Sequence, residues 1–194
     1  MRSAQVEAMF AEFDFARFLY LHDIAFKFVT PTGVKGKDYD FGVQYADGRE
    51  ACADAKCRLE STEVRSVTLR NSLNKARTNN LPPDKPGIIF AKVPQAWLEQ
   101  EDVRKDIFAV VKEFLRNTGR IVSVVLYSTV TQELAGRNML LLGHRFWEFL
   151  NPAHRFDPTM SWALFRDFKV PEGWGGMHPK WVRVFSQGFV LHDK

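Results

Sequence analysis

Two aspartates and a lysine are the residues of this chain whose types and spacing could do chemistry. Asp40 and Asp54 lie in two strand-like runs on either side of a turn at residues 46–48, and Lys56 follows Asp54 by two positions. Two carboxylates held close together need a proton, a cation or a metal between them, because like charges repel. Hard oxygen ligands beside an ammonium suit Mg²⁺ or Mn²⁺. The three residues therefore predict a metal site on a β-hairpin.

The register of this hairpin decides whether the carboxylates meet. A two-residue turn would set Phe41 opposite Asp54 and mix the two faces. A three-residue loop at 46–48 sets Phe41 opposite Ala53 and makes Gly48 the left-handed residue of a type I turn with a bulge. The alternation in the first run supports the second register, because its large apolar side chains then share one dry face; they are Tyr39, Phe41, Val43 and Tyr45.

The polar face of the same register carries the charged residues. Asp40 then lies opposite Asp54, with Cβ atoms roughly 5 Å apart, and Asp38 lies opposite Lys56. The alternative is a charged outer face with a surface pair between Asp38 and Lys56, worth about 0–1 kcal/mol.

Asp40 followed by Asp54-Ala55-Lys56 resembles the PD-(D/E)XK nuclease superfamily, which includes many restriction endonucleases and Holliday junction resolvases. The resemblance covers about residues 5–93, and Tyr39 stands where the proline of the family's name would be. It implies a magnesium-dependent nuclease, with DNA as the expected substrate. Asp40, Asp54 and the Ala55 carbonyl would hold Mg²⁺ or Mn²⁺, and Lys56 would orient or help to deprotonate the attacking water.

The resemblance also suggests further site residues. A glutamate of the first helix often reaches the metal in this group, and Glu7 and Glu12 are the candidates, although solvated helix charge explains either one. A Gln or Lys on the helix after the hairpin can assist, and Lys75 is the best match. Asp38 is a further candidate because of its predicted place on the polar face.

Basic residues near the predicted site could contact nucleic acid. A glycine-flanked loop with Lys35 and Lys37 could hold a phosphate, or it could be an ordinary solvated loop. The positive surface of the helix after the hairpin has the same two interpretations. The residues we expect to contact nucleic acid are Lys35, Lys37, Arg58, Arg65, Arg70 and Arg77.

Hydrophobic periodicity predicts an α/β fold with the order α-β-β-β-α-β-α-β. The expected helices span residues 4–21, 61–78 and 95–118, and the expected strands span 24–30, 38–45, 50–57, 88–91 and 121–127. Helical spacing places Met9, Phe13, Ala16 and Tyr20 of the first helix toward the sheet, with Phe10 and Leu19 beside them. Ser61 or Thr62 would cap the second helix, and the third could be broken near Glu101. This order, with the resemblance, predicts a restriction-endonuclease-like mixed sheet with helices on both faces. We expect a nuclease-like core over residues 1–128 and a C-terminal extension over 129–194, packed on the same domain, in which Met139 to Leu142 form a strand.

Composition limits the remaining classes. The formal charge of +4 permits a nucleic-acid partner without requiring one. Cys52 and Cys57 are five apart on one predicted strand and so point to opposite faces, which prevents a disulfide between them. No Cys/His spacing suggests zinc. The absence of a signal-peptide pattern and of an apolar run of about 18 residues favours a cytoplasmic protein. A homodimer is a candidate assembly, and the alternative function is an inactive nuclease-fold module that binds nucleic acid or a protein.

Overall fold

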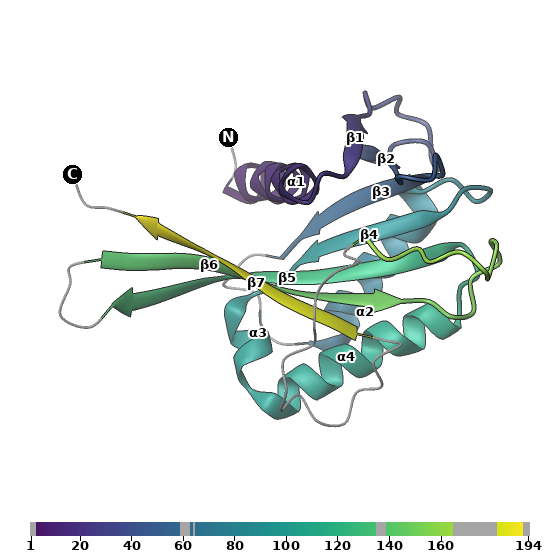
Figure 1. Ribbon diagram of the computed structural model, residues 1–194. Coiled ribbons are helices and arrows are strands. Elements are labelled where there is room, and N and C mark those ends of the chain that lie inside the picture. Colours follow the sequence, from purple (N-terminus) through teal and green to yellow (C-terminus); the bar gives the residue numbers. More distant parts are fainter. Residues whose placement is uncertain (1–2, 59–62, 64, 135–138, 165–181, 192–194) are drawn as a thin grey trace.

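The computed structural model describes residues 3–58, 63, 65–134, 139–164 and 182–191. They form one seven-stranded sheet with helices on both faces (Figure 1). The elements are α1 (Ser3–Leu21), β1 (Ala25–Phe28), β2 (Phe41–Gln44), β3 (Glu50–Cys57), α2 (Ser66–Lys75), the π-helix η1 (Ala76–Asn80), β4 (Gly87–Lys92), α3 (Gln95–Glu99), α4 (Glu101–Arg116), β5 (Ile121–Leu134), β6 (Met139–Leu150) and β7 (Val182–Leu191). No helix in the described ranges is long and apolar enough to cross a membrane.

The sheet is mixed, as predicted, and its strands lie in chain order from β1 to β7. The strands β1, β2 and β3 form an antiparallel meander, β3, β4 and β5 run parallel, and β6 and β7 return antiparallel. The parallel pairs need helical crossovers, which α2 with η1 and then α3 with α4 supply. The fold is therefore α/β, with the hairpin of interest joined directly to the central parallel strands.

The strands after α4 are longer than the sequence predicts. Strand β5 runs to Leu134 instead of ending at Tyr127, and so crosses the boundary expected at residue 128. Strand β6 runs from Met139 to Leu150 rather than to Leu142. Backbone pairing between β5 and β6 sustains both strands along their whole length, which local composition could not reveal. Their far ends project beyond the helices together with β7 (Figure 1).

The register of the β2–β3 hairpin is the predicted one. Phe41 pairs with Ala53, and the Tyr45 amide donates to the Arg49 carbonyl at 2.8 Å, which leaves a three-residue loop. Gly48 lies in that loop with φ +85°. Because side chains alternate along a strand, this register sends Ala53 and Asp54 to opposite faces of the sheet.

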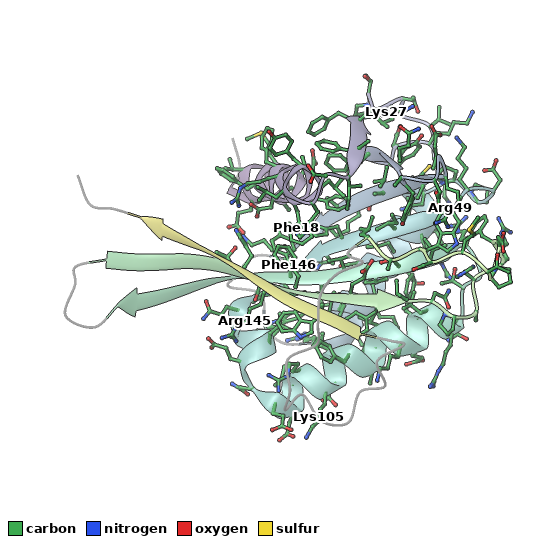
Figure 2. All side chains as sticks on the ribbon, in the orientation of Figure 1. Phe18, Lys27, Arg49, Lys105, Arg145 and Phe146 are labelled. Carbon is green, nitrogen blue, oxygen red and sulfur yellow. The ribbon has the colours of Figure 1, made fainter. Side chains whose placement is uncertain are left out.

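Each face of the sheet has its own core. The β2 and β3 residues of one face pack with α1, and Phe15 of α1 stacks on Phe90 of β4 with ring centroids 4.3 Å apart. Phe18 of α1 likewise meets Phe146 of β6 (Figure 2). The opposite face packs under α2, η1 and α4, where Cys52 joins the second core. Both cysteines are free, as expected.

The buried side of α1 differs from the predicted one. Periodicity placed Met9, Phe13 and Tyr20 toward the sheet, but these side chains are exposed. The buried ones include Phe15 and Phe18, with only Ala16 and Leu19 correctly predicted as buried. Apolar residues occur around most of this helix, so its pattern fits more than one face. The aromatic rings of the sheet select the face that is buried.

The second helix also begins later and ends differently. It starts at Ser66 with Arg65 as its N-cap residue, while the predicted caps Ser61 and Thr62 lie outside the described residues. After Lys75 the chain continues as a π-turn, closed by the bond from the Leu81 amide to the Ala76 carbonyl at 3.0 Å. The break expected near Glu101 in the next helix is present, between α3 and α4.

Gly48 should be required by its backbone conformation rather than by space. No atom would meet a Cβ at Gly48 within 4 Å, yet its φ is +85°. We expect Gly48→Ala to lower the free energy of unfolding by about 1 kcal/mol, measured by urea denaturation. Gly119→Ala is the matched control, since Gly119 has no positive φ and a Cβ there makes only ordinary contacts from 3.6 Å. Equal effects of the two substitutions would contradict the left-handed turn.

Candidate active site

Asp54 is one of two acidic residues in the described strands that are 0% exposed; the other is Glu148 of β6. Asp54 lies near the middle of β3, on the face covered by α2 and η1. A buried carboxylate is costly unless it is paired and hydrogen-bonded. The amide of Asn80, from the end of η1, donates to Asp54 Oδ1 at 2.6 Å, and the ammonium of Lys56 lies 2.5 Å from Asp54 Oδ2. The burial of Asp54 therefore depends on one neighbour from its own strand and one from the helical crossover.

Lys56 connects two oxygen atoms of the predicted metal site. Besides its ion pair with Asp54, its ammonium donates to the Ala55 carbonyl at 3.3 Å. The Lys56 ammonium lies against Asp54 Oδ2, and both its charge and its hydrogen bond lower the pKa of Asp54. Asp54 Oδ2 is therefore already paired with a cation, the ammonium of Lys56.

Asp40 lies just before β2, next to β3, the strand that carries Asp54 and Lys56. Its Oδ2 accepts the Ala55 amide at 2.6 Å, and its own amide donates to the Ala53 carbonyl at 3.0 Å. Burial raises the pKa of Asp40 to about 7, with the nearby Asp54 carboxylate contributing in the same direction. Burial likewise raises the pKa of Asp54, although Lys56 and Asn80 oppose that change. The two aspartates thus lie close enough to repel, as the hairpin register predicts.

Glu12 of α1 joins this group. It is half-buried, and burial raises its pKa, while Lys56 lowers that pKa and Asp54 raises it. Glu12 in turn raises the pKa of Asp40. Of the two glutamates considered from the sequence, Glu12 is therefore the one that interacts electrostatically with Asp40, Asp54 and Lys56.

Asp38 and Lys75, the other two candidates, lie in different surroundings. Asp38 Oδ1 accepts bonds from the Thr32 amide at 2.6 Å and from the Thr32 hydroxyl at 2.7 Å. These bonds lower the pKa of Asp38 and hold the loop before β2, so Asp38 is not the partner of Lys56. The pairing of β2 with β3 begins at Phe41, so it stops before Asp38. The predicted position of Asp38 opposite Lys56 is therefore wrong.

Asn80 is the site residue that the sequence analysis missed. Lys75 is exposed at the end of α2, and the crossover side chain that reaches Asp54 comes five residues later. The available signal was an amide pair, Asn79-Asn80, at the end of a helical stretch. Only the π-turn directs Asn80 toward β3.

The predicted nucleic-acid contacts have varied surroundings. Lys35 and Lys37 are exposed on a loop held against η1, where the Gly36 amide donates to the Asn79 carbonyl at 2.5 Å. Arg65 pairs with Glu63 at 2.6 Å and Arg70 pairs with Glu113 at 2.5 Å. Arg58 donates to the Ser72 hydroxyl within the fold, and Arg77 lines a separate pocket described below. The lysine loop is thus hydrogen-bonded to Asn79, the residue next to Asn80.

The donors available to a metal are two aspartates and one backbone carbonyl. No group of three His, Cys, Asp or Glu side chains arranged to hold a metal occurs among the described residues. The predicted ligand set needs only Asp40, Asp54 and the Ala55 carbonyl, and all three are hard oxygen donors of the kind that Mg²⁺ and Mn²⁺ prefer. The residues fit such an ion in their chemistry, and an ion at Asp54 Oδ2 would share that oxygen with the Lys56 ammonium.

Comparisons with known proteins add little to this site. No protein family model matches the chain, and no curated protein is similar to it in sequence. A solved structure of the central domain of yeast acetyl-CoA carboxylase is similar over 67% of this chain and 23% of its own, with 9% identity and a TM-score of 0.33. A likeness this weak carries no argument about fold or function.

The raised pKa of Asp40 gives a pH prediction. Without metal, folded Asp40 keeps its proton up to about pH 7, whereas the unfolded chain releases it near pH 3.8. The folded state therefore binds more protons in this window, and the free energy of unfolding should fall as pH rises from about 4 to about 7. Asp40→Asn keeps an acceptor for the Ala55 amide and removes this penalty. At pH 8 in EDTA it should be more stable than the wild type by roughly 1–3 kcal/mol.

The measurement is urea denaturation from pH 4 to pH 8. Exposed Asp106 provides the control, because Asp106→Asn should leave the pH profile unchanged. If Asp40→Asn were less stable than the wild type at pH 8 by as much as at pH 4, ionised Asp40 would carry no penalty in the fold, contrary to the argument from burial.

Proposed function

We propose that this protein is a metal-dependent nuclease of the PD-(D/E)XK type, which hydrolyses phosphodiester bonds in DNA. The observation that carries the proposal is that the hairpin brings Asp40, Asp54 and Lys56 together. Asp54 is fully buried there, with the charged Lys56 and the carboxyl group of Asp40 beside it. Burying such a group costs stability. A catalytic requirement gives a reason for that cost.

The order of the elements supports the same proposal. A helix, an antiparallel three-stranded meander, a crossover helix and a parallel fourth strand follow one another from α1 to β4. This is the sequence of elements over which the chain resembles the nuclease group, and the Asp-x-Lys motif lies on the third strand of it. Glu12 of α1 would take the role of the acidic helix residue of that group, and its electrostatic interaction with Lys56 and Asp54 supports this assignment.

Each residue then has a role that its surroundings suit. Asp40, Asp54 and the Ala55 carbonyl would hold Mg²⁺ or Mn²⁺, which acidifies a bound water and stabilises charge on the phosphate. Asn80 is a positioning residue that fixes the Asp54 carboxylate through its bond to Oδ1. Lys56 offsets the charge of Asp54 and would orient the attacking water or accept its proton. The exposed Lys35 and Lys37 would contact the DNA backbone.

Lys56 separates chemistry from stability. Lys56→Met should leave Mn²⁺ affinity equal or tighter, because a positive charge is removed from the ion's surroundings. DNA cleavage with Mg²⁺ should nevertheless fall on the order of 10²-fold, the scale of a lost acid–base group. Lys105→Met is the matched control, since Lys105 lies on the outer side of α4, paired with Glu101 (Figure 2). It should cleave at the wild-type rate.

The assay uses supercoiled, linear, branched and single-stranded DNA with Mg²⁺ or Mn²⁺. Cleavage by Lys56→Met at the wild-type rate would remove Lys56 from the mechanism. If folded wild-type protein left every substrate intact and bound no Mn²⁺, the nuclease proposal would fail. A DNA affinity that still declined steeply with salt would then favour the binding module.

A further inference from the structure

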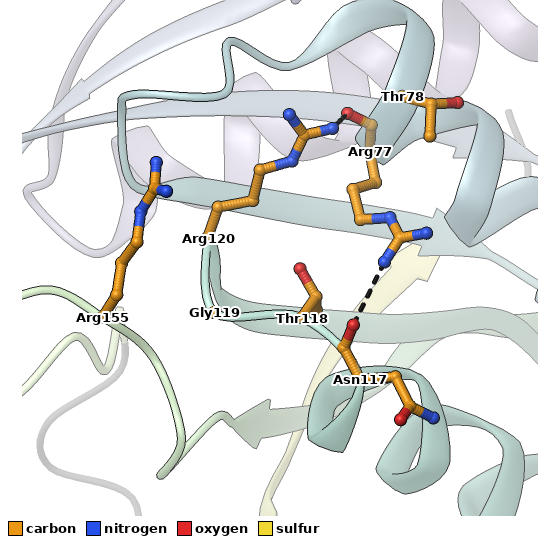
Figure 3. Close-up of a pocket in the computed structure, with 7 residues that line it drawn as sticks. All are labelled: Arg77, Thr78, Asn117, Thr118, Gly119, Arg120 and Arg155. Atoms are coloured by element: carbon orange, nitrogen blue, oxygen red, sulfur yellow. Dashed lines mark hydrogen bonds between the residues drawn. The ribbon is translucent and has the colours of Figure 1, made fainter.

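An open pocket of about 440 Å³ is formed by three segments that are distant in sequence. Arg77 comes from η1, Arg120 from the turn between α4 and β5, and Arg155 from the loop after β6. All three side chains line the same opening (Figure 3). The rest of the lining is small or polar, and it consists of Thr78, Asn117, Thr118 and Gly119.

The three guanidinium groups have no acidic partner in the described part of the chain. Among those residues no carboxylate lies within 4 Å of Arg77, Arg120 or Arg155, whereas other surface arginines such as Arg70 have one. Their recorded hydrogen bonds go to backbone carbonyls instead. Arg77 donates to Asn117 at 3.3 Å, Arg120 to Arg77, and Arg155 to Pro83. Each bond uses one of a guanidinium's five N–H donors.

This arrangement concentrates positive charge without a carboxylate of the described residues beside it. Arg77 lies over the Phe114 ring at 5.6 Å and Arg155 over the Phe156 ring at 5.5 Å, contacts that offset only part of that charge. Burial lowers the pKa of Arg120, and the neighbouring Arg77 and Arg155 lower it further. Arginine remains protonated even so, because its ordinary pKa lies far above neutral pH. The bonds to backbone carbonyls hold the three guanidinium groups near one another, where their like charges repel. A bound anion would relieve this repulsion. The pocket is thus arranged in advance for an anion that accepts several hydrogen bonds.

We propose that Arg77, Arg120 and Arg155 form a binding site for a phosphate group. Guanidinium matches phosphate oxygens with paired N–H donors, and three such groups exceed what one carboxylate ligand could use. The ligand is either a phosphate of a nucleic-acid strand or a free small phosphate, since both present the same oxygens to the pocket.

The nucleic-acid source rests on the proposed nuclease function, and the fold gives it a geometric basis. Segment η1 carries Arg77 near its start and Asn80, the partner of Asp54, at its end. From the strand registers, Arg120 lies two strands and about three residues from Asp54, roughly 14 Å away. A strand bound at Asp54 could therefore place a neighbouring phosphate in the arginine pocket.

The test measures binding without metal, so that no cleavage is needed. Inorganic phosphate is titrated by calorimetry at constant ionic strength set with chloride, and single-stranded oligonucleotides with a 5′-phosphate or a 5′-hydroxyl are compared by fluorescence anisotropy. The variants are Arg155→Gln, at an exposed position, and Arg77→Gln. Lys105→Gln removes the same charge from the outer side of α4 and is the control. Thermal melts establish that each variant is folded.

We expect the wild type to gain thermal stability in phosphate relative to chloride, and each arginine variant to lose affinity about tenfold or more while the control is unchanged. Loss of inorganic phosphate binding identifies a site for free phosphate. Loss of oligonucleotide affinity, with no detectable binding of inorganic phosphate, identifies a nucleic-acid phosphate.

The proposal is overturned if both folded arginine variants match Lys105→Gln with every probe. It is also overturned by a second set of results. In that case phosphate gives the wild type no thermal gain, the wild type binds the 5′-phosphate and 5′-hydroxyl oligonucleotides equally, and the arginine variants bind both oligonucleotides with wild-type affinity. Phosphate binding that needs these arginines, in a protein that cleaves no DNA, would uphold the pocket and refute the nuclease. DNA cleavage by the wild type, with unchanged phosphate and oligonucleotide binding in both arginine variants, would uphold the nuclease and refute the pocket.

Discussion

The burial of one carboxylate organises the candidate site of this molecule. Asp54 has no exposed surface, so its charge must be balanced by groups that the fold brings to it. Lys56 is available from the same strand because side chains two residues apart share a face. Asn80 is available only because α2 ends in a π-turn instead of continuing as an α-helix. Such π-turns are uncommon and are found frequently at functional sites.

The candidate site takes residues from the helical layers on both faces of the sheet. The face under α1 is almost wholly aromatic and aliphatic, with Phe15, Phe41 and Phe90 in direct contact. The opposite face is also apolar under α4, but it admits Asp54 beneath η1. Glu12 approaches from α1 while Asn80 approaches from η1. The candidate site is therefore assembled from both layers and depends on how each packs against one hairpin.

Segment η1 links several parts of the surface. The loop with Lys35 and Lys37 is bonded to Asn79, and Arg120 is bonded to the backbone of Arg77. A short segment thus carries a candidate-site residue at one end and an arginine of the proposed phosphate pocket near the other. Any movement of η1 would alter both places together, because Arg77 and Asn80 are only three positions apart.

The sequence by itself determined the hairpin and the residues that it brings together. Alternation fixed the register that pairs Phe41 with Ala53, because any one-residue slip would expose the core face. That register put Asp40, Asp54 and Lys56 on one side, and the α/β order followed from periodicity and from the buried strands. Local pattern failed wherever packing made the choice: α1 could bury several faces, and Asp38 was claimed by its own loop. The π-turn that directs Asn80, and the pocket that joins Arg77, Arg120 and Arg155 from distant segments, were decided only by the tertiary structure, because no local pattern encodes contacts between residues more than twenty positions apart.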